Sequence, residues 1–406
     1  MKSITLKIPS SSGHELHARL ELPIHQKPAY YAIFAHCFTC SSNLNAVKNI
    51  SRSLTQKGIG VIRFDFTGLG RSGGNFADSY ISANVKDLVD VHEFITANYE
   101  APRLLVGHSL GGAAVLMAAA QLEAVKAVVT IGTPSDTKHT ANHFASQVND
   151  TDTDTSTEVN IGGRPFTINQ EFVADFQKTD LLATVKELRK AILILHAPQD
   201  NIVDINHAQK LYHNAFHPKS FVSLDQADHL LTKKEDSLYA GDLIGSWANR
   251  YISPPEKKTK LQTEGEQVVG HLDLVRDNFT TTIATTKHQL VADEPASVGG
   301  DDFGPSPYEY LNGGLAACTA MTLKMYARRK KWDLQEVYVY LSHSKKHVED
   351  ATSDKPVYLD HIQKKLKFVG DLDETQRNRL KEIASRCPVH RTLLREIVIE
   401  TEVLKD

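Results

Sequence analysis

The pentapeptide Gly107-His108-Ser109-Leu110-Gly111 is the feature that most limits how this chain can fold. It directly follows an apolar run at 103–107, which is typical of a buried strand, and directly precedes the helical pattern LGGAAVLMAAA. In that context, the G-x-S-x-G spacing predicts a strand-to-helix turn so sharp that glycine is needed two residues on either side of the serine. The turn presents the Ser109 hydroxyl at the carboxyl edge of a sheet. It also places the Leu110 amide at a helix N-terminus, where it can stabilise an oxyanion.

The first 250 residues alternate short apolar runs with helical patterns, which predicts an α/β fold with helices on both faces of a mostly parallel sheet. Residues 134–187 interrupt this rhythm with the polar run NDTDTDTSTE, and we interpret them as a lid insertion between two strands. Residues 4–8 and 16–22 predict an antiparallel edge, which makes the sheet eight-stranded. The six other strands are expected at 30–35, 60–64, 103–107, 124–131, 191–196 and 220–224.

The composition changes after residue 252 and divides the chain into domains. Residues 253–265 are rich in Pro, Lys and Glu, which is typical of a linker between a first domain at 1–252 and a second at 266–406. The second domain is predicted to be α+β, with strands around two helices. Its β-patterns lie at 267–274, 278–284, 288–292, 336–342, 359–368 and 396–403, and its helical patterns at 306–330 and 374–386.

The bulk properties exclude several classes of partner. The net charge of −3 gives no reason to expect binding to nucleic acid or to an anionic membrane surface. No apolar run reaches the roughly 20 residues of a membrane span, and the first residues lack an apolar signal core. Four cysteines are too few for a disulfide scaffold, so we expect a cytoplasmic, reducing setting. We expect neither a metal nor a cofactor, because the G-x-G-x-x-G match at 68–73 is not followed by a helical pattern.

A serine nucleophile needs a base and an orienting acid, which follow in the order Ser, Asp, His in this kind of fold. Asp200 comes just after the strand pattern at 191–196, and His229 is the only histidine near the end of the last one. We therefore predict a triad of Ser109, Asp200 and His229. The alternatives for the acid are Asp204, expected to cap a helix, and Asp225 and Asp228, which lie beside His229 in the sequence.

The turn after the strand at 30–35 reads HCFTCSS, and Asp65–Ser72 reads DFTGLGRS. With GHSLGG, these motifs make residues 1–250 resemble the esterase-like branch of the α/β-hydrolase superfamily, which often has HGFTGSS at the first position. The resemblance implies an oxyanion hole formed by the amides of Leu110 and of Phe38 or Cys37, with a cysteine at 37 in place of glycine. Cys37-x-x-Cys40 also fits a thioredoxin-like redox pair, but no thioredoxin-like context surrounds it.

A second candidate centre contains two cysteines. Cys318 lies in LNGGLAACTAMTL, a helical pattern that is apolar nearly all round and therefore predicts burial, which is typical of an inert core cysteine. Cys387 precedes Pro388, which suits the first position of a helix, where a thiolate is stabilised. A buried thiol together with a thiol stabilised at a helix N-terminus favours a pair of one peroxidatic and one resolving cysteine. Nearby positive charge is expected from Arg386, His390 and Arg391.

Residues 266–406 resemble the OsmC/Ohr family, the osmotically inducible and organic hydroperoxide resistance proteins, through DEP, GPSPYE, LNGGLAACTAMTL and CPVHRTL. The resemblance implies an intertwined homodimer with thiol peroxidase activity in oxidative stress. Its substrates would be organic hydroperoxides, and its reductant a dithiol, often lipoyl-linked. Cys318 takes the peroxidatic role and Cys387 the resolving role. Glu309 and Arg276 are the candidates for the family's supporting glutamate and arginine, although Glu309 stands one residue later than in the family.

Together the halves resemble a fusion of an α/β-hydrolase domain with an OsmC-like domain. The sequence predicts a serine hydrolase for small carboxylic esters or thioesters, joined to a thiol peroxidase domain. Two alternatives stay open. The second domain could be a non-catalytic dimerisation module on a plain esterase, or the chain could be mainly a peroxidase with an accessory hydrolase.

Overall fold

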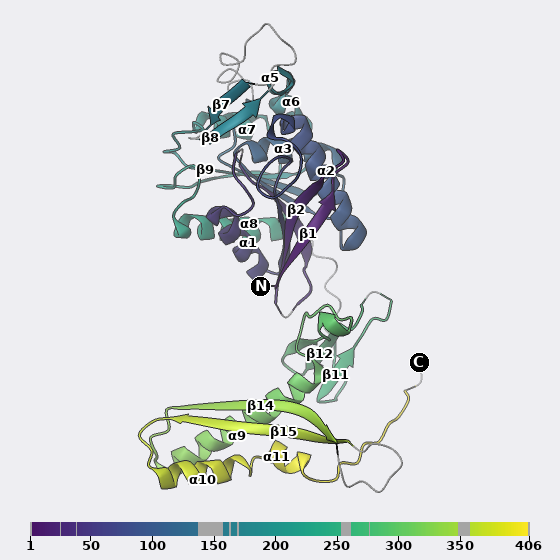
Figure 1. The fold of residues 1–406 in the computed structure, drawn as a ribbon, viewed down its shortest axis with the longest axis vertical. Helices are drawn as coiled ribbons and strands as arrows, with labels where there is room; N and C mark the ends of the chain where they lie inside the picture. Colours follow the sequence, from purple (N-terminus) through teal and green to yellow (C-terminus); the bar gives the residue numbers. More distant parts are fainter. Residues whose placement is uncertain are drawn as a thin grey trace. The chain divides into compact units, whose positions relative to one another are not determined.

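We analysed a computed structural model of the 406-residue chain (Figure 1). The structure describes residues 2–24, 26–37, 39–136, 157–161, 164–168, 170–252, 261–275, 277–347 and 358–404. The chain divides into two compact units, residues 1–260 and 261–406, and each is described by itself. Over the described ranges, no helix combines the length and the apolar composition needed to cross a bilayer.

The first unit is built on one eight-stranded sheet with the strand order β1-β2-β4-β3-β5-β6-β9-β10. The pairs β1–β2 and β2–β4 are antiparallel, and every other pair is parallel. This confirms the predicted mostly parallel sheet with an antiparallel edge. The strands are β1 Lys2–Pro9, β2 Glu15–Leu22, β3 Tyr30–Ala35, β4 Ile59–Phe64, β5 Leu104–His108, β6 Ala127–Ile131, β9 Ala191–His196 and β10 Lys219–Ser223.

Helices cover both faces of this sheet, because alternate side chains of each buried strand point to opposite sides. One set of strand residues, including Phe34 and Val106, packs with α1 (Asn45–Gln56) and α8 (Lys234–Tyr251) in a single core. The intervening residues, such as Ile33 and Leu105, are also fully buried. On that side, α2 (Ile81–Asn98) and α3 (Leu110–Gln121) contact the central strands. The remaining helices outside the insertion are η1 Phe76–Asp78 and α7 Asn206–Asn214.

The insertion between β6 and β9 forms secondary structure of its own (Figure 1). It contains the hairpin of β7 (Thr157–Ile161) and β8 (Arg164–Ile168), followed by α5 (Gln170–Lys178) and α6 (Leu181–Glu187). Ser82 on α2 donates two hydrogen bonds to Asp175 on α5, which ties the insertion to the helices of the sheet. The polar run at 149–156 lies outside the described residues. The role of this insertion as a lid stays a prediction.

The second unit contains a three-stranded antiparallel sheet and a long hairpin. The central helix α9 contacts strand β14 of the hairpin and the two helices that follow it (Figure 1). This arrangement confirms the predicted α+β class. The elements are β11 Val268–His271, β12 Thr281–Thr285, β13 Gln289–Ala292, η2 Ala296–Val298, α9 Pro307–Lys330, β14 Glu336–His347, β15 Tyr358–Val369, α10 Glu374–Ala384 and α11 Pro388–Leu393.

Two expectations for the second unit were wrong. Helix α9 is not buried nearly all round, because this chain covers one stripe of it only. The buried stripe runs through Leu315 and Leu323, whereas Met321 and Met325 are 64% and 74% exposed. The strand expected at 396–403 is not formed, and among the described residues no strand pairs with it to satisfy its backbone.

Candidate active sites

Ser109 occupies the sharp turn between β5 and α3. Its backbone has a φ of 55° and a ψ of −125°, a conformation that a residue with a side chain adopts only at an energetic cost. The Ser109 amide donates to the carbonyl of Ile131, 2.8 Å away, and so holds the turn against β6. A Cβ on Gly107 would lie 2.4 Å from the Gly111 carbonyl oxygen, and a Cβ on Gly111 would lie 2.3 Å from that of His36. Both glycines of the motif are therefore sterically required.

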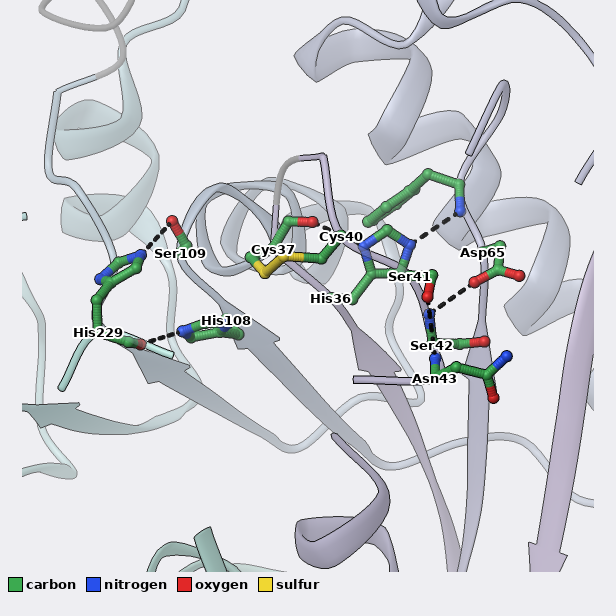
Figure 2. The surroundings of a disulfide bond; sticks show 11 residues. His36, Cys37, Cys40, Ser41, Ser42, Asn43, Asp65, His108, Ser109 and His229 are labelled. Atoms are coloured by element: carbon green, nitrogen blue, oxygen red, sulfur yellow. Dashed lines mark hydrogen bonds between the residues drawn. A yellow bond between two sulfur atoms is a disulfide. The ribbon is translucent and has the colours of Figure 1, made fainter. Parts of the chain in front are cut away.

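The structure brings Ser109, His229 and Asp200 together. The Nε2 atom of His229 lies 3.1 Å from Ser109 Oγ (Figure 2), and its Nδ1 atom lies 2.7 Å from Asp200 Oδ2. Ser109 and Asp200 are only 8% and 9% exposed. Burial acts to raise the pKa of Asp200, but hydrogen bonds from His229 and from the Val203 amide outweigh it and hold that pKa below its usual range. The carboxylate is therefore ionised where the imidazole needs it.

The alternative acids bind other partners. Asp204 accepts from the Asn206 amide at 2.8 Å, at the start of α7. Asp225 accepts from the Ser223 hydroxyl at 2.6 Å, and Asp228 accepts from the Thr232 amide at 2.8 Å. In this structure Asp200 is thus the carboxylate that is hydrogen-bonded to the His229 ring.

His108 is a site residue that the sequence interpretation missed. Its Nε2 atom lies 2.7 Å from the backbone carbonyl oxygen of His229, and the two rings are 5.1 Å apart (Figure 2). Burial, followed by the neighbouring His229, lowers the pKa of His108 to about 4, so the ring is neutral and donates from Nε2. The only available signal was its position as the first variable residue of the G-x-S-x-G motif.

The turn after β3 lies beside the Ser109 turn. Ala35 and Gly107 are partners in the pairing of β3 with β5, so Cys37 and Ser109 each follow that pair by two residues. The Cys37 carbonyl accepts from His36 Nδ1 at 2.7 Å and from the Cys40 amide at 3.1 Å. Leu110 is the first residue of α3, where the helix itself offers no acceptor for its amide. Phe38, the other predicted oxyanion residue, lies outside the described residues.

Cys37 and Cys40 are joined by a disulfide bond (Figure 2). The sequence interpretation set a thioredoxin-like redox pair aside here and did not predict this bond. The physical reason is local, because a four-residue turn brings the two Cα atoms to 5.4 Å, within the range that a disulfide spans. A C-x-x-C pair therefore needs no thioredoxin fold in order to close.

The free cysteines of the second unit, Cys318 and Cys387, also lie together. The Cys318 side chain lies near enough to help lower the pKa of the Cys387 thiol, and Cys387 contacts the Thr319 hydroxyl at 3.5 Å and the His390 amide at 3.4 Å. Cys387 caps the N-terminus of α11, as expected. The expected burial is reversed, because Cys387 is fully buried whereas Cys318 on α9 is partly exposed.

Lys364 on β15 supplies positive charge to this pair and was also missed. Burial acts to raise the pKa of the Cys387 thiol, but its hydrogen bonds to Thr319 and His390, then the neighbouring Cys318 and the charge of Lys364, bring that pKa below its usual value. Lys364 is itself held by the Ala384 carbonyl at 2.7 Å. Alternate residues of a strand point to the same side, and this pattern does not indicate which lysine of β15 faces the thiols. The sequence therefore offered no signal for Lys364.

The two residues proposed to support a peroxidase have different outcomes. The Glu309 carboxylate accepts from the amide and the hydroxyl of Ser306, 2.7 and 2.9 Å away, as the N3 residue of a capping box on α9. Cys318 follows Glu309 by nine residues, about 13.5 Å along the helix and on its opposite face. The structure therefore does not bring Glu309 to the thiols. Arg276 lies outside the described residues.

Comparison with known proteins agrees with this division of the chain. Residues 28–186 match the family described as serine aminopeptidase, S33, and residues 299–402 match the family described as OsmC-like protein. The first unit is thus an α/β-hydrolase domain of the esterase-like type. The chain as a whole belongs to the proteins that join an α/β-hydrolase domain to an OsmC-like domain.

Relatives of the first unit include solved esterases. The esterase domain of a Rhodothermus marinus protein is 45% identical with a TM-score of 0.53, in a match that covers 62% of this chain and 99% of that structure. Est1E from Butyrivibrio proteoclasticus, with bound ferulic acid, is 19% identical with a TM-score of 0.54 over 61% of this chain and 99% of its own, and it shows the fold alone.

Curated relatives include the mitochondrial palmitoyl-protein thioesterase ABHD10. The mouse protein is 29% identical over 204 residues, which are 48% of this chain and 68% of that protein. The human protein is 26% identical over 204 residues, 47% of this chain and 63% of its own length. The chain therefore spans about two thirds of the length of these relatives.

Proposed function

We propose that the first unit is a serine hydrolase of carboxylic ester or thioester bonds. The hydrogen-bonded series from Asp200 through His229 to Ser109 carries this proposal. A serine hydroxyl is a weak nucleophile at its ordinary pKa, and an adjacent imidazole that is itself held by a carboxylate is the arrangement that activates it. The strained Ser109 backbone presents the hydroxyl at the sheet edge, where it can reach the carbonyl carbon of a substrate.

The reaction follows from these positions. Ser109 Oγ attacks the carbonyl carbon while His229 Nε2 takes its proton, and Asp200 stabilises the imidazolium through Nδ1. The Leu110 amide and an amide of the turn at 37–38 hold the oxyanion. His229 then returns the proton to the leaving alcohol or thiol. Water, activated by the same imidazole, hydrolyses the acyl-enzyme and regenerates Ser109.

The relatives support both leaving groups. The Rhodothermus marinus relative is named an esterase domain, and the mouse relative is named a palmitoyl-protein thioesterase. An alkoxide and a thiolate leave from the same tetrahedral intermediate, so one triad serves both classes of bond. The predicted lid at 134–187 is where we expect selection of the acyl group to occur.

The direct test replaces Ser109 by alanine. We expect Ser109→Ala to lower kcat for a short-chain nitrophenyl ester by on the order of 10⁵-fold with the fold intact. Ser223→Ala is the matched control, because the Ser223 hydroxyl bonds to Asp225 and not to the triad. Unchanged hydrolysis in Ser109→Ala would mean that the triad assignment is wrong.

For the second unit we propose a thiol peroxidase, because its two free thiols are neighbours and one has a lowered pKa. Cys318, which is partly exposed, attacks the terminal oxygen of an organic hydroperoxide and becomes a sulfenic acid, while the alcohol leaves with a proton. Cys387 then attacks that sulfur, which releases water and forms a disulfide. A dithiol reductant restores both thiols and becomes a disulfide itself.

One equivalent of an organic hydroperoxide, added to the reduced protein, tests this second activity. We expect an intact mass lower by two hydrogens and a Cys318–Cys387 crosslink in the peptide map, neither of which occurs in Cys318→Ser. If both thiols stay open to alkylation while esters are still hydrolysed, the second unit is a non-catalytic module. If the protein reduces the hydroperoxide but does not hydrolyse esters, the chain is mainly a peroxidase and the first unit is accessory to it.

We also propose that the second unit forms a homodimer in a cytoplasmic, reducing setting. The supporting observation is the exposed apolar segment that follows α11, in which Val398, Ile399 and Val403 are 80%, 83% and 88% exposed. These residues are rich in β-branched side chains and have unpaired backbone groups, which is the character of a strand awaiting a neighbour. Pairing with a second copy would cover them and the exposed methionines of α9.

A further inference from the structure

We propose that Cys37 and Cys40 form a thiol–disulfide exchange site, at which a dithiol opens the bond and thereby lowers hydrolysis at Ser109. The inference rests on the proposed serine hydrolase function and extends it to a second class of reactant. The two cysteines stand at both positions where HGFTGSS has glycine, and they close a covalent ring beside the nucleophile (Figure 2).

The disulfide holds a turn that its sequence alone does not favour. Cys37 and Cys40 are the first and last residues of the turn, and the Cys40 amide donates to the Cys37 carbonyl at 3.1 Å. Thr39 has a φ of +65°, a conformation that suits glycine and that a β-branched residue rarely adopts. Opening the disulfide therefore allows Thr39 to relax toward a negative φ and the turn to change shape.

The chain on both sides of this turn is fixed. His36 donates from Nδ1 to the Cys37 carbonyl, and its Nε2 atom accepts from the Phe66 amide at 3.3 Å. Beyond the turn, the Ser42 amide donates to Asp65 at 2.6 Å (Figure 2). The Ser42 carbonyl accepts from Arg63 at 2.6 Å. These bonds hold His36 and Ser42, so we expect a change caused by reduction to lie between them.

The altered segment borders the reacting atoms. A Cβ on Gly111 would lie 2.3 Å from the His36 carbonyl oxygen and 2.6 Å from that of Ala35, so the first turn of α3 packs directly on the backbone before Cys37. The second oxyanion amide is expected from this same turn. Loss of one well-placed oxyanion donor costs about 10²–10³-fold in kcat, so even its partial displacement is expected to be measurable.

The two sulfurs differ in access, which sets the direction of exchange. Cys37 is 3% exposed, whereas Cys40 is partly exposed. A thiolate of the dithiol attacks Cys40 Sγ and forms a mixed disulfide, while Cys37 Sγ leaves with the electron pair and is protonated. The second thiol of the reductant then attacks the reductant sulfur that is bonded to Cys40. Cys40 Sγ leaves from this bond and takes a proton. The dithiol is oxidised to a cyclic disulfide and the protein gains two thiols.

A disulfide in a reducing compartment is usually transient and serves catalysis or redox sensing. The proposed peroxidase of the second unit uses a reductant of the same chemical class. A supply of dithiol would therefore reach both cysteine pairs, regenerating the thiols at Cys318 and Cys387 and opening the bond at Cys37 and Cys40. Hydrolysis would be fast when dithiol is scarce and slow when it is abundant.

The test uses the full chain with Cys318→Ser and Cys387→Ser, so that Cys37 and Cys40 are the only cysteines left of the four. The protein is equilibrated at a series of ratios of reduced to oxidised dithiothreitol. Alkylation followed by intact mass counts open thiols, and kcat is measured for a short-chain ester at each ratio. We expect two thiols to open together with a fall in kcat of at least about tenfold, reversed on reoxidation.

The same background with Cys37→Gly and Cys40→Gly is the control, and its kcat is expected not to depend on the ratio. Equal kcat in the open and closed forms, or two open thiols at every ratio, would overturn the exchange site. Labelling of Ser109 with a fluorophosphonate separates this failure from that of the hydrolase. Equal labelling and turnover in both forms refute the exchange site alone, whereas no labelling and no turnover in either form refute the hydrolase and the inference that rests on it.

Discussion

The serine centre of the first unit and the thiol centre of the second differ in how much of their surroundings one chain supplies. Around Ser109, the sheet edge and the helices leave the triad serine and aspartate less than 10% exposed. Around Cys318 and Cys387, the same helix that carries one thiol also exposes Met321 and Met325 by 64% and 74%. The three residues of the proposed triad come from a single copy, whereas the thiols lie on or beside a helix with exposed methionines.

The difference follows from the architecture of the two units. In a parallel sheet, the carboxyl ends of all strands meet at one edge, so residues that follow β5, β9 and β10 converge without help from another chain. In the second unit, the hairpin and two short helices cover one stripe of α9. Exposed apolar side chains gathered on one helix are typical of an interaction site. The comparison therefore predicts that hydrolysis survives changes that separate two copies, whereas hydroperoxide reduction does not.

The largest expected effect is on the serine centre alone. Asp200→Asn keeps the size of the side chain but removes the charge that holds His229 in its reactive tautomer, so kcat for ester hydrolysis should fall by about 10⁴-fold. Hydroperoxide consumption by the second unit should not change. Asp204→Asn is the matched control, because Asp204 bonds to the Asn206 amide instead. A larger loss in the control than in Asp200→Asn would reassign the acid.

Separating two copies should give the next largest effect, and on the other centre. Ile399 is 83% exposed in one chain, so Ile399→Asp should leave the fold of that chain intact while it places a charge in the proposed interface. Loss of one buried side chain at the centre of an interface costs about 2 kcal/mol or more of binding free energy. The dissociation constant of the dimer, measured by sedimentation, should therefore rise at least roughly 30-fold. Hydroperoxide turnover should fall with it at constant ester turnover.

Ile24→Asp makes the same change at a 56% exposed position of the first unit and serves as the control. It should leave the sedimentation of the protein unchanged. If the wild-type chain sediments as a monomer and still reduces hydroperoxide, the thiol centre does not need a second copy. The predicted difference between the two centres would then be wrong. The exposed apolar surface of the second unit would then serve some other partner.

The sequence allowed prediction of those parts of the sites that depend on local rules. The Ser109 turn needs glycine at fixed places, and the acid and base come directly after strand patterns, so their order and spacing were sufficient. The contact of Cys387 with the start of α11 followed from the Cys-Pro step. Glu309 could have been assigned correctly as well, because Ser306-Pro307-Tyr308-Glu309 fits the capping-box spacing.

Features that depend on distant or missing neighbours could not be predicted. Lys364 reaches the thiols through the pairing of two long strands and the packing of α9 on them, which no local pattern encodes. The expected strand at 396–403 has the right composition but no neighbour in its own unit. The Cys37–Cys40 bond depends on the shape of one turn, whereas the sequence interpretation looked for a whole redox fold around it.

His108 tests how rigid the serine centre is. His108→Ala removes the hydrogen bond to the His229 carbonyl, and a single buried hydrogen bond contributes about 1 kcal/mol, so kcat should fall by roughly fivefold to tenfold at constant KM. Because the pKa of His108 is about 4, the ring is neutral throughout the neutral range, and the loss should not vary with pH there. His108→Gln, which retains a donor, should recover part of the rate. His213→Ala, on exposed α7, is the control.

The smallest expected effect concerns the charge at the thiol centre. Lys364 stabilises the Cys387 thiolate, so Lys364→Met should raise the pKa of that thiol and move its titration to higher pH. A rise of about half to one pKa unit lowers the thiolate fraction at neutral pH by roughly threefold to tenfold. The ultraviolet absorbance of the thiolate, followed against pH, measures this shift directly. Formation of the Cys318–Cys387 disulfide, the step in which Cys387 attacks, should slow at neutral pH and recover at alkaline pH.

Two further variants separate charge from structure. Lys364→Arg retains a cation and should keep most of the wild-type titration, whereas Lys365→Met removes the adjacent, exposed lysine and should leave it unchanged. If Lys364→Met titrates like the wild type, the hydrogen bonds from Thr319 and His390 suffice to stabilise the thiolate. The thiol centre would then owe the lowered pKa of Cys387 to these two hydrogen bonds, whereas the serine centre depends on the charge of Asp200.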